Sequence, residues 1–141
     1  IDGKLGANDN YMLGRSYYFT KNYPLADSTF KKITVSNPKL PLGYLWRARA
    51  NTKQDSGNAN WLAKRHYEKF IEAALAKKKF KKKNLTEAYT YIGVYHINQE
   101  AYGLAKKYFL LILELDPENE NAETFLESDE GKNAKVPEEG E

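Results

Sequence analysis

The sequence carries Leu13-Gly14-Arg15-Ser16-Tyr17, then Ala26-Asp27-Ser28-Thr29-Phe30, then Pro38. A later stretch has the same arrangement, with Ile92-Gly93-Val94-Tyr95-His96, Ala105-Lys106-Lys107-Tyr108-Phe109 and Pro117. In both stretches 12 residues separate Gly from Ala, four separate Ala from Phe, and eight separate Phe from Pro. Three spacings that occur twice indicate an internal repeat.

A degenerate copy lies between these two stretches. Ala48 follows Gly14 by 34 residues, and Ala63 and Tyr67 repeat the Ala-to-aromatic spacing. Ala48 precedes Gly93 by 45 residues, which is 11 more than one period. Three of the additional residues fall before Ala63 and eight after Tyr67.

Apolar residues recur at spacings of three and four throughout, which is typical of amphipathic helices. The small residues allow two helices to approach closely, and the prolines stop the second helix of each pair. We expect helices over 7–20, 24–36, 41–53, 60–79, 85–98, 101–115 and 118–127. The segment from Glu72 to Lys79 is made of good helix formers with no Gly or Pro, so we expect the helix from about Asn60 to run about two turns past its counterparts.

The repeated spacings resemble those of the tetratricopeptide repeat family, whose 34-residue pattern carries Leu-Gly, Tyr, Ala, Phe and Pro at these positions. The family's tryptophan position holds Asn10, Tyr44 and Tyr89. The resemblance implies an all-α, right-handed superhelix of about three helix-turn-helix units with a C-terminal capping helix. The expected divisions are a lead at 1–6, units at 7–40, 41–85 and 86–119, a capping helix at 120–128 and a disordered acidic tail at 129–141. Because the repeat begins in mid-pattern, we expect further repeats upstream.

Composition excludes several other classes of protein. Hydrophobic residues make up 41% of the 141 residues, which is enough for a core. The absence of Cys excludes disulfide scaffolds, thiol nucleophiles and iron–sulfur clusters. No apolar run approaches the ~18 residues that span a bilayer. We therefore expect a soluble chain with no targeting segment, whose compartment the sequence leaves open.

Charge is unevenly distributed although the net charge is only +3. Residues 31–83 carry 15 basic and three acidic side chains, whereas residues 114–141 carry two basic and 11 acidic ones. The densest part is a lysine run made of Lys77, Lys78, Lys79, Lys81, Lys82 and Lys83. Three interpretations stay open: a solvated helix end, a docking site for an acidic protein, or a nucleic-acid site, which the lack of sequence-reading side chains does not favour.

Few residues of the sequence could serve in catalysis or bind a metal. His66 and His96 belong to different repeats, and His96 stands at the motif tyrosine, where we expect it to be packed; we expect His66 to be exposed. No His-x-x-x-His pair and no glycine-rich phosphate loop occurs. We therefore expect no enzyme activity, no metal and no cofactor.

In the tetratricopeptide repeat family, which the sequence resembles, the first helices line a groove that holds peptides. By position, that resemblance implies a groove lined by Asn8, Tyr11, Arg15, Tyr18, Phe19, Leu42, Leu45, Arg49, Thr52, Lys53, Glu87, Thr90, Val94, Ile97 and Asn98. The family's carboxylate clamp would fall on Tyr11, Arg15, Trp46, Glu87 and Tyr91, of which only Arg15 is basic, so we expect no such clamp. The expected function is a protein-interaction module or scaffold with a protein or peptide partner. Equally open is a structural role, in which these residues pack against further repeats or a second copy.

Overall fold

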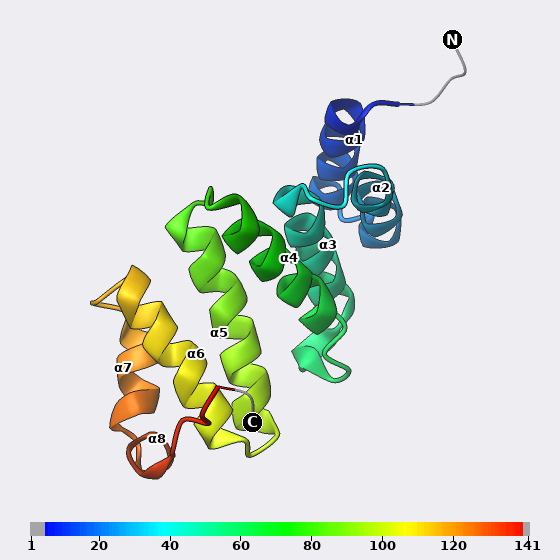
Figure 1. Cartoon of the computed structure of the whole chain (residues 1–141). Helices are drawn as coiled ribbons and strands as arrows, with labels where there is room; N and C mark the ends of the chain where they lie inside the picture. The colour runs from blue at the N-terminus through cyan, green and yellow to red at the C-terminus, as the bar shows by residue number, and fades with distance from the viewer. Residues whose placement is uncertain (1–4, 140–141) are drawn as a thin grey trace. The chain divides into compact units, whose positions relative to one another are not determined.

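The computed structural model describes residues 5–139 and has helices but no strands over that range, which confirms the expected all-α helical-repeat fold (Figure 1). The first four residues of the expected lead and the last two of the expected tail lie outside the described residues. The helices are α1 (Ala7–Phe19), α2 (Tyr23–Ser36), α3 (Pro41–Gln54), α4 (Lys64–Lys77), α5 (Lys82–Asn98), α6 (Tyr102–Leu115), α7 (Glu120–Glu127) and α8 (Asp129–Asn133), with a 3-10 turn, η1, at Ser56–Asn58.

The chain forms two compact units, Ile1–Lys79 and Phe80–Glu141. In the first, unit 1, each helix from α1 to α4 packs against the next, so that it holds two helix pairs. In the second, unit 2, α5 packs against α6, and α7 and α8 pack against α6 and each other. None of the helices within residues 5–139 is both long enough and apolar enough to cross a lipid bilayer.

The small, aromatic and aliphatic positions of the repeat form the core of every pair. They recur at spacings of four and three on α2, on α4 and the residue before it, and on α6. None is more than 4% exposed: Ala26, Phe30 and Ile33; Ala63, Tyr67 and Phe70; Ala105, Phe109 and Ile112. Full burial of one such large side chain contributes roughly 1.5–3 kcal/mol. The three sets therefore occupy equivalent buried positions.

Glycine on the first helix is required by the ring on the second. A Cβ atom on Gly14 would lie 2.6 Å from Cε1 of Phe30, and one on Gly93 would lie 2.9 Å from Cε2 of Phe109. Both distances are shorter than a carbon–carbon contact allows. The pairing of glycine with phenylalanine thus sets how closely these helices approach.

The prediction of a helix from about 60 to 79 is wrong at both ends. The carboxylate of Asp55 accepts hydrogen bonds from the backbone N–H groups of Asn60 (3.0 Å) and Leu62 (3.1 Å), which holds residues 55–62 as a turn. The helix therefore begins only at Lys64, and it ends at Lys77 because Lys78 adopts the left-handed conformation with φ of 54°.

The eight additional residues are instead shared between two helices. α4 has 14 residues, as α2 and α6 do, but it ends 14 residues after Ala63 whereas α2 ends 10 residues after Ala26. α5 has 17 residues against 13 for α1 and 14 for α3. It begins at Lys82 rather than 85, and Asn84, whose sequence context resembles a helix cap, is buried inside it.

The expectation of a disordered tail from residue 129 is also wrong. The Ser128 hydroxyl accepts a hydrogen bond from the Gly131 N–H and caps α8. Beyond α8, the Lys106 ammonium donates to the Ala134 carbonyl oxygen at 3.1 Å. Local capping and these backbone contacts order a segment that has few apolar side chains.

Candidate functional site

Six side chains of α1 and α3 meet on unit 1. We call them the aromatic–arginine cluster: Tyr11, Arg15, Tyr18 and Phe19 from α1, and Trp46 and Arg49 from α3. The α1 members are spaced by four, three and one residues, which places them along one face of that helix. Five of the six belong to the set expected to line a groove.

Trp46 is the centre of the cluster. Its ring meets those of Tyr11, Tyr18 and Phe19 edge-on, at centroid distances of 6.2, 5.3 and 6.0 Å. On the core side it stacks on Phe30 at 5.6 Å. Because Trp46 is 8% exposed, it is a rigid floor for the cluster rather than its contact surface.

Arg15 lies over three of these rings. Its guanidinium carbon is 5.5 Å from the ring centroid of Tyr11, 5.7 Å from that of Phe19 and 5.4 Å from that of Trp46. Exposed cation–π contacts of this kind contribute about 0.5–1 kcal/mol each. The Arg15 side chain is exposed, and it forms no ion pair with an acidic residue of 5–139.

Arg49 places a second positive charge on the same ring. Its guanidinium carbon is 4.8 Å from the Trp46 centroid. Phe19, which is 64% exposed, adds an apolar surface at the C-terminal end of α1. The cluster therefore presents an arginine and an exposed ring on a fixed aromatic base, which suits a partner with a carboxylate beside an apolar side chain.

Other expected groove residues of unit 1 do not join the cluster. Leu45 is fully buried, so the expectation that it lines a groove is wrong; it belongs to the core between α3 and its neighbours. Asn8, Leu42 and Lys53 are exposed on α1 and α3, and Thr52 donates its hydroxyl to the Ala48 carbonyl oxygen.

The remaining expected groove residues lie on α5 of unit 2. Val94 and Asn98 are exposed, whereas Glu87 and Ile97 are half-buried. The Thr90 hydroxyl donates to the Thr86 carbonyl oxygen within the same helix. Their helical spacing places them along one stripe of α5.

The lysine run is exposed at all six lysines. Lys77 is the last residue of α4, and Lys82 and Lys83 are the first two of α5. Lysine is favoured near the negative C-terminal end of a helix and disfavoured near the positive N-terminal end. Lys77 and the C-cap residue Lys78 thus have the helix-end placement that the solvated-helix interpretation supposes, whereas Lys82 and Lys83 do not.

The two histidines have different surroundings. His96 is packed as expected, with its ring stacked on Tyr108 at 5.6 Å. His66 is half-buried rather than exposed. Burial is the main cause that lowers the pKa of His66; Arg47 and Arg65 also lower this pKa, whereas Asp27 raises it. Within the described part of the chain, His, Asp and Glu side chains nowhere gather in a group of three that could hold a metal ion.

Sequence reasoning missed two features of this region. It assigned Trp46 only to a clamp position, although the tryptophan is the centre of the cluster. It also missed the ion pair between Arg47 Nε and Asp27 Oδ1 (2.9 Å), which Asn51 joins by donating to the same oxygen at 2.8 Å. Arg47 precedes Arg49 by two residues, and on a helix this spacing directs the two side chains to different faces of α3. Arg47 therefore pairs with Asp27, whereas Arg49 lies over Trp46.

Comparison with solved structures gives two informative matches. The chain superposes on the crystal structure of the C-terminal part of a TPR repeat-containing protein from Cytophaga hutchinsonii with a TM-score of 0.83 and 38% identity, over 91% of this chain and 50% of that one. The chain thus spans half the length of that structure. It also superposes on the first TPR of Spaghetti (RPAP3) bound to an HSP90 peptide, with a TM-score of 0.64 and 22% identity, over 85% of this chain and 86% of that one. No protein-family model and no curated protein matches the chain.

Proposed function

The chain belongs to the tetratricopeptide repeat family, and we propose that it is a non-catalytic module that binds a protein or peptide segment. We infer that the aromatic–arginine cluster is its contact surface. The observation that supports this proposal is Arg15, an exposed cation held over three rings, which forms no ion pair within residues 5–139. A similar fold in complex with an HSP90 peptide makes peptide binding a reasonable role for such a surface.

The chemistry of the cluster defines the class of partner. An arginine pre-positioned over Trp46 loses little conformational entropy when it binds a carboxylate. Phe19 offers an exposed ring beside it. The proposed partner is a peptide that carries an acidic residue next to a large apolar one.

A random peptide library selected against the chain tests this function. Arg15→Ala should weaken the selected peptides roughly tenfold, which corresponds to ~1.4 kcal/mol. Arg65→Ala is the matched control, because Arg65 is an exposed arginine on α4 outside the cluster. Equal affinities of the two variants would move the contact surface elsewhere, most plausibly to the lysine run.

Self-association is a second candidate function, and charge favours it. The sequence of Ile1–Lys79 carries 15 basic and six acidic side chains, whereas that of Phe80–Glu141 carries seven basic and 13 acidic ones. Oppositely charged units of two copies attract each other, more strongly at low salt. Sedimentation velocity should show a mass that rises with concentration at low salt and falls back at high salt. A monomer mass at every concentration and salt would exclude this role.

A further inference from the structure

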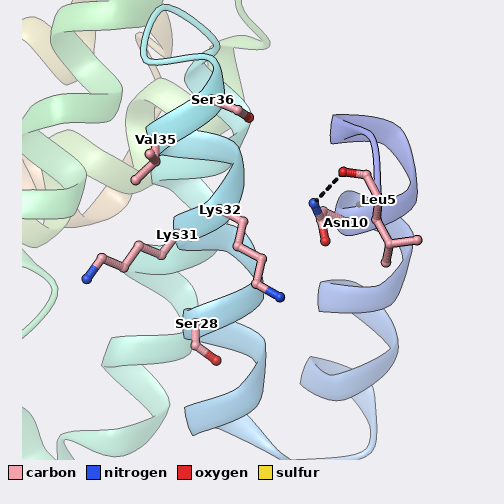
Figure 2. A pocket seen from close by; sticks show the side chains of 7 residues that line it. All are labelled: Leu5, Asn10, Ser28, Lys31, Lys32, Val35 and Ser36. Atoms are coloured by element: carbon pink, nitrogen blue, oxygen red, sulfur yellow. Dashed lines mark hydrogen bonds between the residues drawn. The ribbon is translucent and has the colours of Figure 1, made fainter. Parts of the chain in front are cut away.

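A cavity of about 710 Å³ lies in unit 1, outside the aromatic–arginine cluster (Figure 2). The N-terminal part of α1 contributes Asn10, and α2 contributes Lys31, Lys32 and Val35. Leu5 adds an apolar side chain, and Val35 is 72% exposed. The cavity thus combines apolar side chains with two lysines and one carboxamide.

Asn10 has an unsatisfied hydrogen-bond acceptor. The side chain is 6% exposed, and its Nδ2 donates to the Leu5 carbonyl oxygen at 3.3 Å. Its Oδ1 accepts no hydrogen bond from residues 5–139. In Figure 2 the carboxamide lies between α1 and α2, with its nitrogen toward Leu5 and its oxygen on the other side. A buried acceptor without a donor costs about 1–3 kcal/mol, so the site favours a ligand that donates.

The second helix pair has a tyrosine where the first has this asparagine. Tyr44 follows Asn10 by 34 residues, and it lines a smaller cavity of about 480 Å³ together with Lys69 and Glu72. Relative to the core alanines Ala26 and Ala63, Lys69 corresponds to Lys32 and Glu72 to Val35. The Tyr44 hydroxyl donates to the Pro38 carbonyl oxygen at 2.8 Å, so the ring's polar end is satisfied.

The third pair repeats this arrangement in unit 2. Tyr89 takes the same position, is buried, and meets the ring of Tyr108 at 5.9 Å. Burial is the main cause that raises the pKa of Tyr89, and Tyr108 and Glu114 also raise it. Glu114 corresponds to Val35 in the repeat register. Two of the three pairs therefore place a ring from their own first helix at this position, where the first pair has Asn10.

We propose that the cavity of the first pair binds a Trp or Tyr side chain from a partner protein, flanked by acidic residues. The ring would take the place that Tyr44 and Tyr89 take in the other pairs. Its N–H or O–H would donate to Asn10 Oδ1, and Lys31 and Lys32 would attract the flanking carboxylates. Neither lysine forms an ion pair within residues 5–139.

This site is independent of the aromatic–arginine cluster, because the two sets share no residue. Either can fail without the other. A partner that used both would gain affinity from the link between its two contact segments.

The test uses a short synthetic peptide with a central Trp between glutamates, titrated into the isotope-labelled chain and followed by NMR. Wild-type chain should bind it, with shift changes at the Asn10 side-chain amide, Lys32 and Val35. Replacing the peptide Trp by Phe removes the donor and should weaken binding several-fold. Asn10→Tyr places a ring of the chain itself in the cavity, so it should raise the melting temperature and weaken the peptide at least tenfold.

Two further variants keep the test decisive. Should Asn10→Tyr not fold, Lys31→Glu with Lys32→Glu reverses the charge at exposed positions and should also weaken the peptide. Arg65→Ala, which changes an exposed residue of α4 outside both sites, should leave binding unchanged. The proposal is overturned if the peptide does not bind, if Phe binds as well as Trp, if the Asn10 and lysine variants bind normally, or if the shift changes fall at Arg15 and Phe19 instead of Asn10, Lys32 and Val35.

Discussion

The first and second helix pairs build the same core on different lengths of chain. Ala26, Phe30 and Ile33 in one pair match Ala63, Tyr67 and Phe70 in the other, yet three residues join α1 to α2 whereas nine join α3 to α4. The additional residues of the second pair are held by Asp55. The core register is therefore set by the small residue and the ring, while the chain outside that contact is free to lengthen.

The largest effects should come from the matched rings. Phe30→Ala and Tyr67→Ala should each lower the free energy of unfolding by ~3–5 kcal/mol, because each leaves a cavity in a closely packed core. Chemical denaturation measures both. A loss below ~1 kcal/mol for Tyr67→Ala would mean that the second pair does not use the register of the first.

The small residue on the first helix differs between the pairs, so the two reciprocal substitutions should differ in cost. Gly14→Ala should cost about 1–3 kcal/mol, since its Cβ would lie 2.6 Å from Cε1 of Phe30. Ala48→Gly should cost only about 0.5–1 kcal/mol, through lost helix propensity. Gly6→Ala is the control, because nothing lies within 4 Å of its Cβ. A Gly14→Ala variant as stable as wild type would refute the close-approach explanation.

The long loop of the second pair depends on one carboxylate. Asp55→Ala should cost about 1–2 kcal/mol, because two backbone N–H groups lose their acceptor. Asn22→Ala in the first pair should cost less, since Asn22 Oδ1 accepts only from Leu25 N at 3.5 Å. Thermal unfolding of the two variants gives the comparison, and an equal loss would mean that Asp55 does not organise its loop.

The smallest effect should be a pH dependence specific to the second pair. The folded chain lowers the pKa of His66 mainly by burial, so the unfolded chain binds a proton at higher pH than the folded one. The contribution to stability is present above the unfolded pKa of about 6.5 and is lost as the pH falls below it. His66→Gln should flatten the change in unfolding free energy between pH 7.5 and 5.5. An unchanged profile would exclude His66 as its source.

Sequence periodicity predicted the residues whose role repeats. Gly14, Ala26 and Phe30 have the same surroundings as Gly93, Ala105 and Phe109, so matching spacings identify matching contacts. The predicted α1 face Tyr11–Arg15–Tyr18 also forms, because helical phase alone brings those side chains together.

Features that depend on non-repeating contacts could not be predicted in this way. Trp46 and Leu45 are adjacent in sequence, and only the packing of α3 against α1 and α2 decides which one lies under the cluster. The delayed start of α4 depends on the turn that Asp55 holds, which helix propensity does not describe. The ordered segment after Glu127 depends on caps and backbone contacts such as Lys106 to Ala134, which leave no apolar period in the sequence.

A double-mutant cycle tests the proposed contact surface most directly. It combines Arg15→Ala in the chain with removal of each acidic residue, in turn, from a peptide selected against the wild type. The account predicts that one carboxylate is coupled to Arg15 by about 1 kcal/mol or more, and that the coupling weakens as salt is raised. Additive losses for every acidic position would contradict it, because Arg15 would then contact no carboxylate of the partner.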